Sequence, residues 1–169
     1  MPDGGTMDGS RCDSYCGIYC GACDILAACR RGEPGAFSAY LKERVPPAGD
    51  WRCKGCKSDE VFGNCARCPI RACARERGLE SCAACPEFPC AAYSRPDAER
   101  LLAELPHLKL NAGNLAAIAE RGVEAWLRGQ EELWRCPECG APDSWYAETC
   151  PVCGASLAGR KPYGATSPS

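Results

Sequence analysis

The chain has 169 residues, enough for one compact domain or two small ones, and 17 of them are cysteine. Its formal net charge of −2 argues against a general nucleic-acid-binding protein, and no run of about 18 apolar residues is present to span a membrane. The first nine residues have neither the basic nor the apolar region of a secretory signal. We therefore expect a cytoplasmic protein. In those reducing surroundings cysteines are expected to bind metal rather than to form disulfides.

The distribution of cysteine along the chain predicts five segments. We expect a disordered tail at 1–11, a cysteine-rich metal-binding domain at 12–95, a helical segment packed on it at 96–134, a zinc ribbon at 135–158 and a second disordered tail at 159–169. Leu, Ile, Val and Phe are sparse before residue 96, so metal coordination is expected to replace an ordinary core there. The predicted fold is a small metal-stabilised protein: an irregular cysteine-rich core with short α-helices, a helical middle segment and a C-terminal zinc-ribbon β-hairpin.

The predicted helices of the cysteine-rich domain are short. We expect them over residues 21–31, 36–44 and 69–77. Gly32 and Gly78 stand just past two of the expected ends, Pro46-Pro47 ends the second helix, and Pro69 suits a first helical turn. No stretch of this domain alternates cleanly between apolar and polar residues over five or more positions, so strands are expected only in hairpins at the cysteine pairs.

The cysteine-free segment has helical periodicity. Asp97 is suited to cap a helix over 98–105, and Gly122 is expected to divide the following pattern into two helices. The apolar residues of that pattern are Leu115, Ile118, Ala119, Val123, Trp126 and Leu127. We interpret them as an ordinary core face, with a groove for a partner helix as the alternative. His107 is the only histidine, and we expect it to be exposed or to cap a helix rather than to act in catalysis.

Two copies of Cys-Pro-x-Cys-Gly near the C-terminus predict a tetrahedral metal site. The four ligands are Cys136, Cys139, Cys150 and Cys153. Each glycine permits a tight turn in which amide N–H groups point at sulfur, and Trp145-Tyr146 suit a strand of the hairpin between the pairs. Four protein ligands leave no open position, so the site is expected to be structural. Zinc is favoured over iron, because rubredoxin-like sites usually have a longer segment between their two cysteine pairs.

Eleven further cysteines are candidate metal ligands in the cysteine-rich domain. They are Cys16, Cys20, Cys23, Cys53, Cys56, Cys65, Cys68, Cys73, Cys82, Cys85 and Cys90. Cys12 and Cys29 lie outside the close pairs and are the candidate spare thiols. Spacing does not reveal which pairs share an ion. Sequential pairing within 53–68 is the simplest arrangement, whereas interleaved pairing would join the N-terminal helix to residues 82–90.

The metal of these N-terminal sites is expected to be zinc, with an iron–sulfur cluster as the alternative. Cys16, Cys20 and Cys23 have the Cys-x₃-Cys-x₂-Cys spacing of radical SAM enzymes. The chain is too short for the barrel of those enzymes, and it has no alternation of strands and helices. Basic residues crowd the same region, and they are interpreted as offsetting thiolate charge, as a solvated face, or as a phosphate or RNA contact.

The ordered cysteine motifs resemble a prokaryotic family called DUF3795. They are Cys16-Gly17-x-x-Cys20-Gly21-x-Cys23, Cys53-Lys54-Gly55-Cys56, Cys68-Pro69-Ile70-Arg71-x-Cys73 and Cys82-x-x-Cys85-Pro86-Glu87-Phe88-Pro89-Cys90. Gly122-x-x-x-Trp126-Leu127, followed by Trp134-Arg135-Cys136, is similar to members with an appended zinc ribbon. The resemblance implies a metal-binding domain, commonly assumed to hold zinc, and no established reaction.

We therefore expect a zinc-binding protein that acts as a non-enzymatic adaptor or interaction module for a protein partner. No Gly-rich phosphate loop follows a strand, and the single histidine does not complete a catalytic triad. A nucleic-acid partner has less support, because the net charge is acidic. The alternative function is an iron–sulfur redox or sensor protein of anaerobic metabolism, and a third is a thiol enzyme using Cys12 or Cys29.

Overall fold

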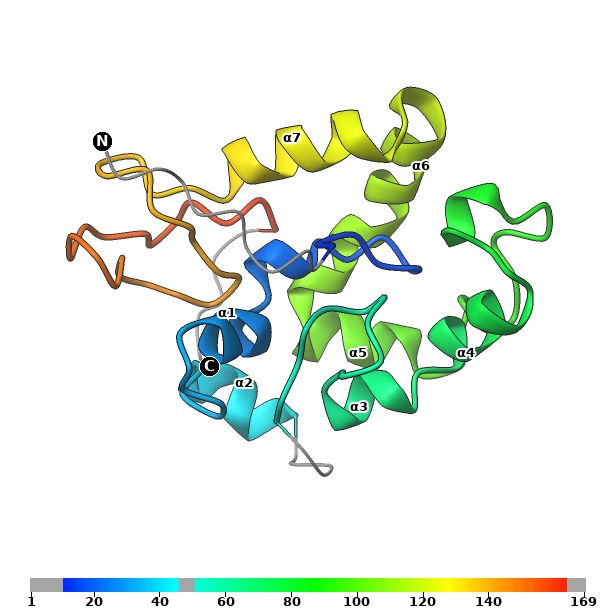
Figure 1. The fold of residues 1–169 in the computed structure, drawn as a ribbon, viewed down its shortest axis with the longest axis horizontal. Helices are drawn as coiled ribbons and strands as arrows, with labels where there is room; N and C mark the ends of the chain where they lie inside the picture. The colour runs from blue at the N-terminus through cyan, green and yellow to red at the C-terminus, as the bar shows by residue number, and fades with distance from the viewer. Residues whose placement is uncertain (1–10, 46–50, 164–169) are drawn as a thin grey trace.

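The computed structural model describes residues 11–45 and 51–163, and the regular structure of these residues is helical (Figure 1). The α-helices are α1 (Asp24–Arg30), α2 (Ala39–Arg44), α3 (Gly63–Ala66), α4 (Pro69–Glu76), α5 (Ala98–Glu104), α6 (Asn111–Arg121) and α7 (Val123–Leu133). Three 3₁₀ turns join them: η1 (Cys20–Ala22), η2 (Cys82–Ala84) and η3 (Pro106–Leu110). No described helix is both long and apolar enough to cross a membrane.

The prediction of a zinc-ribbon β-hairpin is wrong, because the described residues form no strand. Only two isolated bridges are present there, between Arg135 and Pro142 and between Thr149 and Ser156. Each bridge closes a loop around one cysteine pair, and no ladder continues from it. Residues 1–10 and 164–169 of the predicted tails lie outside the described residues, as does the helix end predicted at Pro46-Pro47.

The predicted helices are present, and the first two begin later than expected, whereas those predicted from residues 69 and 98 begin there. The first starts at Asp24 rather than at residue 21, because residues 20–22 turn as η1 around two cysteines. The second starts at Ala39, where the Ser38 hydroxyl accepts a hydrogen bond from the Leu41 amide at 3.4 Å. Gly32 and Gly78 follow α1 and α4 with φ of 75° and 64°, the left-handed conformation that glycine favours after a helix.

Around the middle segment, Gly122 divides α6 from α7 as predicted, with φ of 80°. Asp97 precedes α5 but makes no capping hydrogen bond. Its carboxylate is instead paired with Arg95 at 2.8 Å and Arg100 at 3.2 Å. The apolar positions of α6 and α7 include the buried Leu115 and Trp126, so the interpretation as a core face fits the packing.

One apolar core joins the cysteine-rich part to the C-terminal third of the chain. From residues 19–62 it contains Tyr19, Ala22, Ile25, Leu41, Val45 and Phe62. Its other members are Trp126, Trp134, Trp145 and Tyr146. Large aromatic side chains from outside residues 12–95 thus complete the interior of that segment, which has too few apolar residues to fill it alone.

His107 is buried against this apolar core, and the prediction that it is exposed or caps a helix is wrong. Only 6% of its surface is exposed, and its ring stacks on Trp145 with 3.7 Å between centroids. Its Nδ1 lies 2.6 Å from the hydroxyl of Tyr146 in a hydrogen bond. Trp145 and Tyr146 are therefore parts of the core rather than of a strand. Burial lowers the pKa of His107 to about 3, so the ring is neutral at pH 7.

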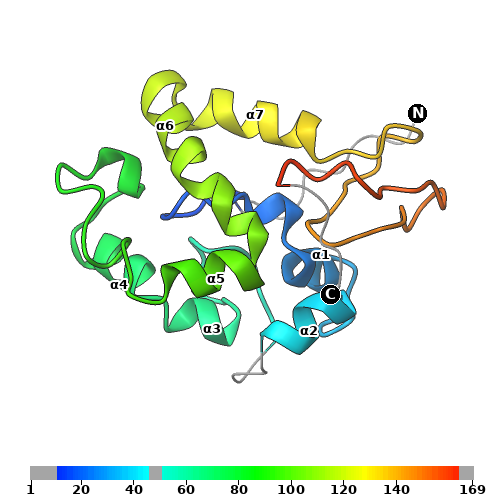
Figure 2. The ribbon, with the colours of Figure 1, turned by 180° about the vertical axis from the view of Figure 1, so that it is seen from behind.

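Residues 11–23 run through the middle of the molecule, as both views of the ribbon show (Figures 1 and 2). Gly17 lies against the start of α6 with φ of 91°, and a Cβ there would be 2.5 Å from the carbonyl oxygen of Asn111. Asn114 donates to the Gly17 carbonyl at 2.8 Å and accepts from the Trp126 indole at 3.2 Å. This close approach therefore fixes the first cysteines against both α6 and α7.

Gly17→Ala is expected to lower the free energy of unfolding by about 2 kcal/mol or more, because it adds a backbone clash to a strained φ. Gly129→Ala is the matched control. Gly129 lies in the interior of α7, and a Cβ there would meet open space. Alanine at this position should therefore raise the free energy of unfolding, by at most about 1 kcal/mol. Denaturant unfolding of the three proteins measures both changes. Equal stabilities for the two variants would contradict the close approach.

Acid should destabilise the protein through His107. The unfolded chain takes up a proton near pH 6.5, whereas the folded ring stays neutral until about pH 3, so this contribution to stability falls as the pH drops between those values. His107→Phe removes this pH dependence, which amounts to at most about 1.4 kcal/mol of unfolding free energy per pH unit. The same substitution also removes the hydrogen bond to Tyr146. Tyr146→Phe loses the same bond but keeps the imidazole. Between pH 7 and 5.5 the free energy of unfolding should depend less steeply on pH in His107→Phe than in wild type or Tyr146→Phe. Equal slopes in all three proteins would contradict the buried neutral histidine.

Candidate metal centre

The four C-terminal cysteines converge to form a compact sulfur cluster, which we call the knuckle site. The sulfurs of Cys136, Cys139, Cys150 and Cys153 all lie within 4.8 Å of one another, so the cluster could hold a metal ion. The Sγ atoms of Cys136 and Cys153 are 3.6 Å apart, and those of Cys139 and Cys150 are 3.7 Å apart. Four sulfurs bound to one Zn²⁺ at about 2.3 Å stand about 3.8 Å apart, so the spacing fits such an ion.

The two halves of the site repeat the same local structure. Gly140 donates to the Cys136 carbonyl at 2.9 Å, and Gly154 donates to the Cys150 carbonyl at 3.0 Å. Both glycines have positive φ, of 72° and 74°, which permits the turn after each second cysteine. The predicted turns are thus present without the predicted strands, because each loop closes on itself.

Amide groups in the turns face the sulfurs, as the Cys-Pro-x-Cys-Gly pattern predicts. The N–H groups of Cys153 and Val152 lower the pKa of the Cys150 thiol to about 6. The Ala155 N–H likewise favours the Cys153 thiolate, but the adjacent thiols of Cys139 and Cys136 raise the pKa of Cys153 to about 12. One sulfur is thus ready to ionise, whereas four charges so close together require a cation.

The knuckle site is attached to the core by the segment between its two loops. The Trp145 amide donates to the Ala22 carbonyl at 3.0 Å, next to the buried carboxylate of Asp24. Asp143 forms a buried ion pair with Lys161 at 2.7 Å, and that ammonium also donates to the Ser144 carbonyl at 2.6 Å. Sequence reasoning missed this pair, since no local pattern relates the two residues.

A second group of cysteines gathers inside residues 20–65. Cys20 lies near enough to Cys23, Cys56 and Cys65 to interact electrostatically, and the Cys56 N–H faces its sulfur. Cys23 interacts in the same way with Cys53. Burial raises the pKa of Cys23 to about 12. The N-terminal cysteines therefore meet the pairs at 53–65 in space, and the pairs at 53–68 are not set apart as one sequential unit.

A third group lies further along the cysteine-rich part. Cys82 interacts with Cys90, Cys85, Cys73 and Cys68, so residues 68–90 bring five thiols into one region. Cys16 interacts with Cys56 and Cys68, between the second and third groups. The structure thus brings all eleven predicted N-terminal ligands near other cysteines. In the described residues, however, only the knuckle sulfurs are gathered within 4.8 Å.

Cys12 and Cys29 have other surroundings. The Cys12 sulfur accepts a hydrogen bond from the Arg30 guanidinium at 3.2 Å. The Cys29 thiol donates to the Trp51 carbonyl at 3.1 Å. Their role as spare thiols stays a prediction.

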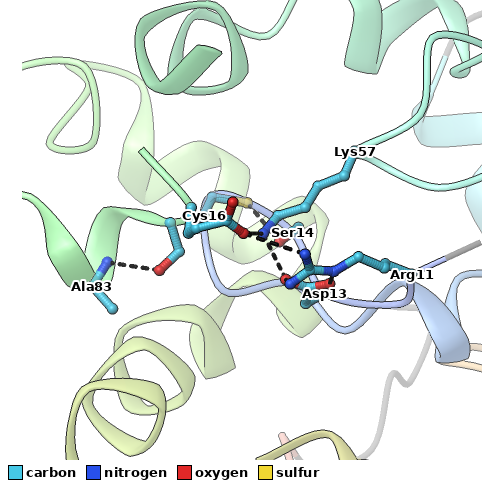
Figure 3. A network of polar contacts seen from close by, with 8 residues as sticks. Arg11, Asp13, Ser14, Cys16, Lys57 and Ala83 are labelled. Atoms are coloured by element: carbon cyan, nitrogen blue, oxygen red, sulfur yellow. Dashed lines mark hydrogen bonds and ion pairs between the residues drawn. The ribbon is translucent and has the colours of Figure 1, made fainter. Parts of the chain in front are cut away.

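A polar network orders the first cysteines relative to two other loops (Figure 3). The buried carboxylate of Asp13 lies 2.9 Å from Arg11 and 2.6 Å from Lys57, and Lys57 also reaches Glu80 at 3.2 Å. The adjacent Ser14 hydroxyl is 3.6 Å from the Cys16 sulfur. Ion pairs in so enclosed a place hold geometry more than they add stability. Here they hold Cys16 beside the loops that carry Cys56 and Cys82.

The basic residues near the cysteines have specific partners. Arg71 donates to the carbonyls of Cys56 and Ser58, both at 2.9 Å. Arg75 is paired with Asp59 at 3.0 Å, and Arg77 lies 3.4 Å from the Cys85 sulfur. Most of these side chains thus stabilise the loops, whereas Arg77 faces a thiol directly, as expected of a cation that offsets thiolate charge.

Residues 12–95 match the model of a family described as a protein of unknown function (DUF3795). This span agrees with the resemblance in the cysteine motifs and supports it. The match ends before residue 136, so the C-terminal metal centre rests on the sulfur cluster itself. No curated protein sequence and no solved structure matches the chain.

The knuckle site is expected to bind one metal ion per chain. Cys139→Ser should lose that single ion, because oxygen is a poor substitute for thiolate in a four-sulfur site. Cys12→Ser should lose none and is the control, since Cys12 lies outside the cysteine groups. Elemental analysis of protein purified without oxygen measures metal per chain. An unchanged count in Cys139→Ser would contradict the assignment.

Proposed function

Taking the match to a family without an assigned activity as the premise, we propose that this protein is a zinc-binding interaction module rather than an enzyme. The observation that carries the proposal is the closed four-sulfur cluster of the knuckle site. Four protein ligands leave no coordination position for a substrate, and a closed site of this kind contributes folding free energy instead of chemistry. Zinc is the proposed metal, because the segment between the knuckles is shorter than in rubredoxin-like iron sites.

The absence of acid–base machinery in the described residues supports a non-enzymatic role. The single histidine is buried between Trp145 and Tyr146 and stays neutral to about pH 3, so it is not poised for proton transfer near pH 7. The buried carboxylates of Asp13 and Asp143 are both held in ion pairs with lysine, and that of Asp24 accepts a hydrogen bond from the Tyr146 amide at 3.5 Å. All three carboxylates thus have partners within the fold.

The proposed contact surface is a groove between the α1 side of the molecule and the second knuckle. Its volume is about 640 Å³, and its lining includes Ala27, Phe37, Pro142, Pro151 and Val152. Val152 is 72% exposed, and among the described residues Leu133 is the other exposed large apolar side chain. An exposed apolar residue at the edge of such a groove is typical of a surface that a protein segment covers. The proposed partner is therefore a protein that inserts an apolar side chain beside Val152.

Val152→Asp is expected to abolish this contact, because it places a charge at the apolar edge. Leu133→Asp is the matched control, since Leu133 is 44% exposed at the end of α7 and does not line the groove. The tagged full-length chain is purified from its host together with bound proteins, which are quantified. A partner retained by wild type and Leu133→Asp but reduced at least about tenfold with Val152→Asp, about 1.4 kcal/mol, supports the proposal. Equal retention by all three proteins would refute it.

An iron–sulfur protein is the second candidate, and the second group of cysteines favours it. Five thiols lie near one another there, those of Cys20, Cys23, Cys53, Cys56 and Cys65, and four of them would be enough to hold an iron–sulfur cluster. Protein purified without oxygen distinguishes the two functions. A visible charge-transfer band with iron and sulfide in the sample supports the redox alternative, whereas a colourless protein containing only zinc supports the interaction module.

A further inference from the structure

A small, partly open cavity lies among residues 70–93, and four cysteines line it. They are Cys73, Cys82, Cys85 and Cys90, and the aromatic rings of Phe88 and Tyr93 close the cavity with them. The cavity measures about 10 Å³, close to the smallest space that holds one water molecule. Apart from the sulfurs its lining is almost wholly apolar, so a water there would lack the partners that it needs.

The local structure explains how four residues spread over eighteen positions meet. Cys73 lies in α4, and Gly78 reverses the chain directly after that helix with φ of 64°. Cys82 begins η2, and its amide donates to the Tyr15 carbonyl at 2.8 Å. Cys85 follows η2 through a hydrogen bond to the Cys82 carbonyl at 3.1 Å. The succeeding turn then returns Cys90 to the same cavity.

The four thiols are close in space as well as in their lining of one cavity. Cys82 interacts electrostatically with each of Cys73, Cys85 and Cys90. Among the described residues only the knuckle sulfurs all lie within 4.8 Å, so a bound ion has to draw this second set inward. The cavity between the sulfurs leaves room for that movement, because the thiols turn into empty space rather than against packed atoms.

A cation is already positioned beside this set. The Arg77 guanidinium lies 3.4 Å from the Cys85 sulfur, and it also interacts with Cys73. A Zn²⁺ ion bound by four thiolates carries a net charge of −2, and a guanidinium at hydrogen-bond distance offsets part of it. Glu87 fixes the position of Arg77 through an ion pair at 3.2 Å. Arg77 is thus oriented toward sulfur by a partner on the same loop as Cys85.

We propose that Cys73, Cys82, Cys85 and Cys90 form a second, mononuclear zinc site, separate from the knuckle site. Binding releases the four thiol protons to solvent as four Zn–S bonds form, so no oxidant or reductant is needed. One ion would use all four thiolates as ligands, which is the closed arrangement of a structural zinc site. The ion joins α4 to the turns at 82–90 and takes the place of a core in this part of the molecule.

Metal counts in single and double variants of the full chain test whether the four cysteines share one ion. Cys73→Ser and Cys90→Ser should each lose one zinc per chain relative to wild type. The double variant Cys73→Ser/Cys90→Ser should also lose one, whereas Cys73→Ser/Cys139→Ser should lose two, because Cys139 belongs to the knuckle site. Loss of two ions from the first double variant, no loss from either single variant, or iron in place of the lost zinc would overturn the proposal.

Arg77 provides a test that leaves every ligand intact and therefore does not depend on the folding of cysteine variants. Arg77→Gln should speed the release of one zinc to a chelator by about tenfold, since the guanidinium that offsets the charge of the thiolates is lost. Arg75→Gln is the matched control, because Arg75 lies on the same helix but is paired with Asp59. Equal release rates from the two variants would overturn the proposal. The ion of the knuckle site is counted separately, by comparing Cys139→Ser with wild type. If the knuckle site held no ion, the proposed function would be refuted, but the proposed site at residues 73–90 would not.

Discussion

Buried sulfur is the constraint on which the structure of residues 12–95 depends. Burial raises the pKa of Cys16 and Cys23 to about 12, because a thiolate is poorly solvated away from water. Without a cation, such thiols stay protonated and pack only as small apolar side chains. A bound metal ion reverses this preference, since it deprotonates its ligands and joins distant parts of the chain. Metal coordination can therefore supply the cohesion that the few apolar residues of this segment do not.

The apolar core has a different origin from the sulfur groups, and the two support each other. Trp134, Trp145 and Tyr146 come from the segment that carries the knuckle cysteines, yet they pack with Ile25 and Leu41 of the cysteine-rich part. The knuckle loops have only a small core of their own around Leu157. Closing those loops around an ion would thus fix the ends of the segment whose aromatic residues complete the main core. The position of the metal centre and the packing of the N-terminal half are consequently linked.

Local signals in the sequence were sufficient for some of these features and not for others. The repeated Cys-Pro-x-Cys-Gly pattern predicted the knuckle cluster, and glycine positions predicted the ends of α1, α4 and α6, because both depend on neighbouring residues. Burial of His107 could not be predicted, since its partner Tyr146 lies 39 positions away. The β-hairpin was predicted from the two cysteine pairs and the segment between them, in which the aromatic pair at 145–146 suits a strand; burial of that pair in the core overrides strand propensity. Pairing of the N-terminal cysteines depends on the folded path of the chain, which spacing does not encode.

The most direct test of metal coordination as a substitute for core is thermal unfolding of the full chain before and after its metal is removed by a chelator, with the thiols kept reduced. Near-UV circular dichroism reports on the tryptophans of the shared core. Loss of that signal and of the cooperative transition on metal removal, with both restored by added zinc, is the predicted result. An unchanged spectrum and melting temperature in the metal-free protein would contradict the account, as would cystines in place of thiols in the native chain.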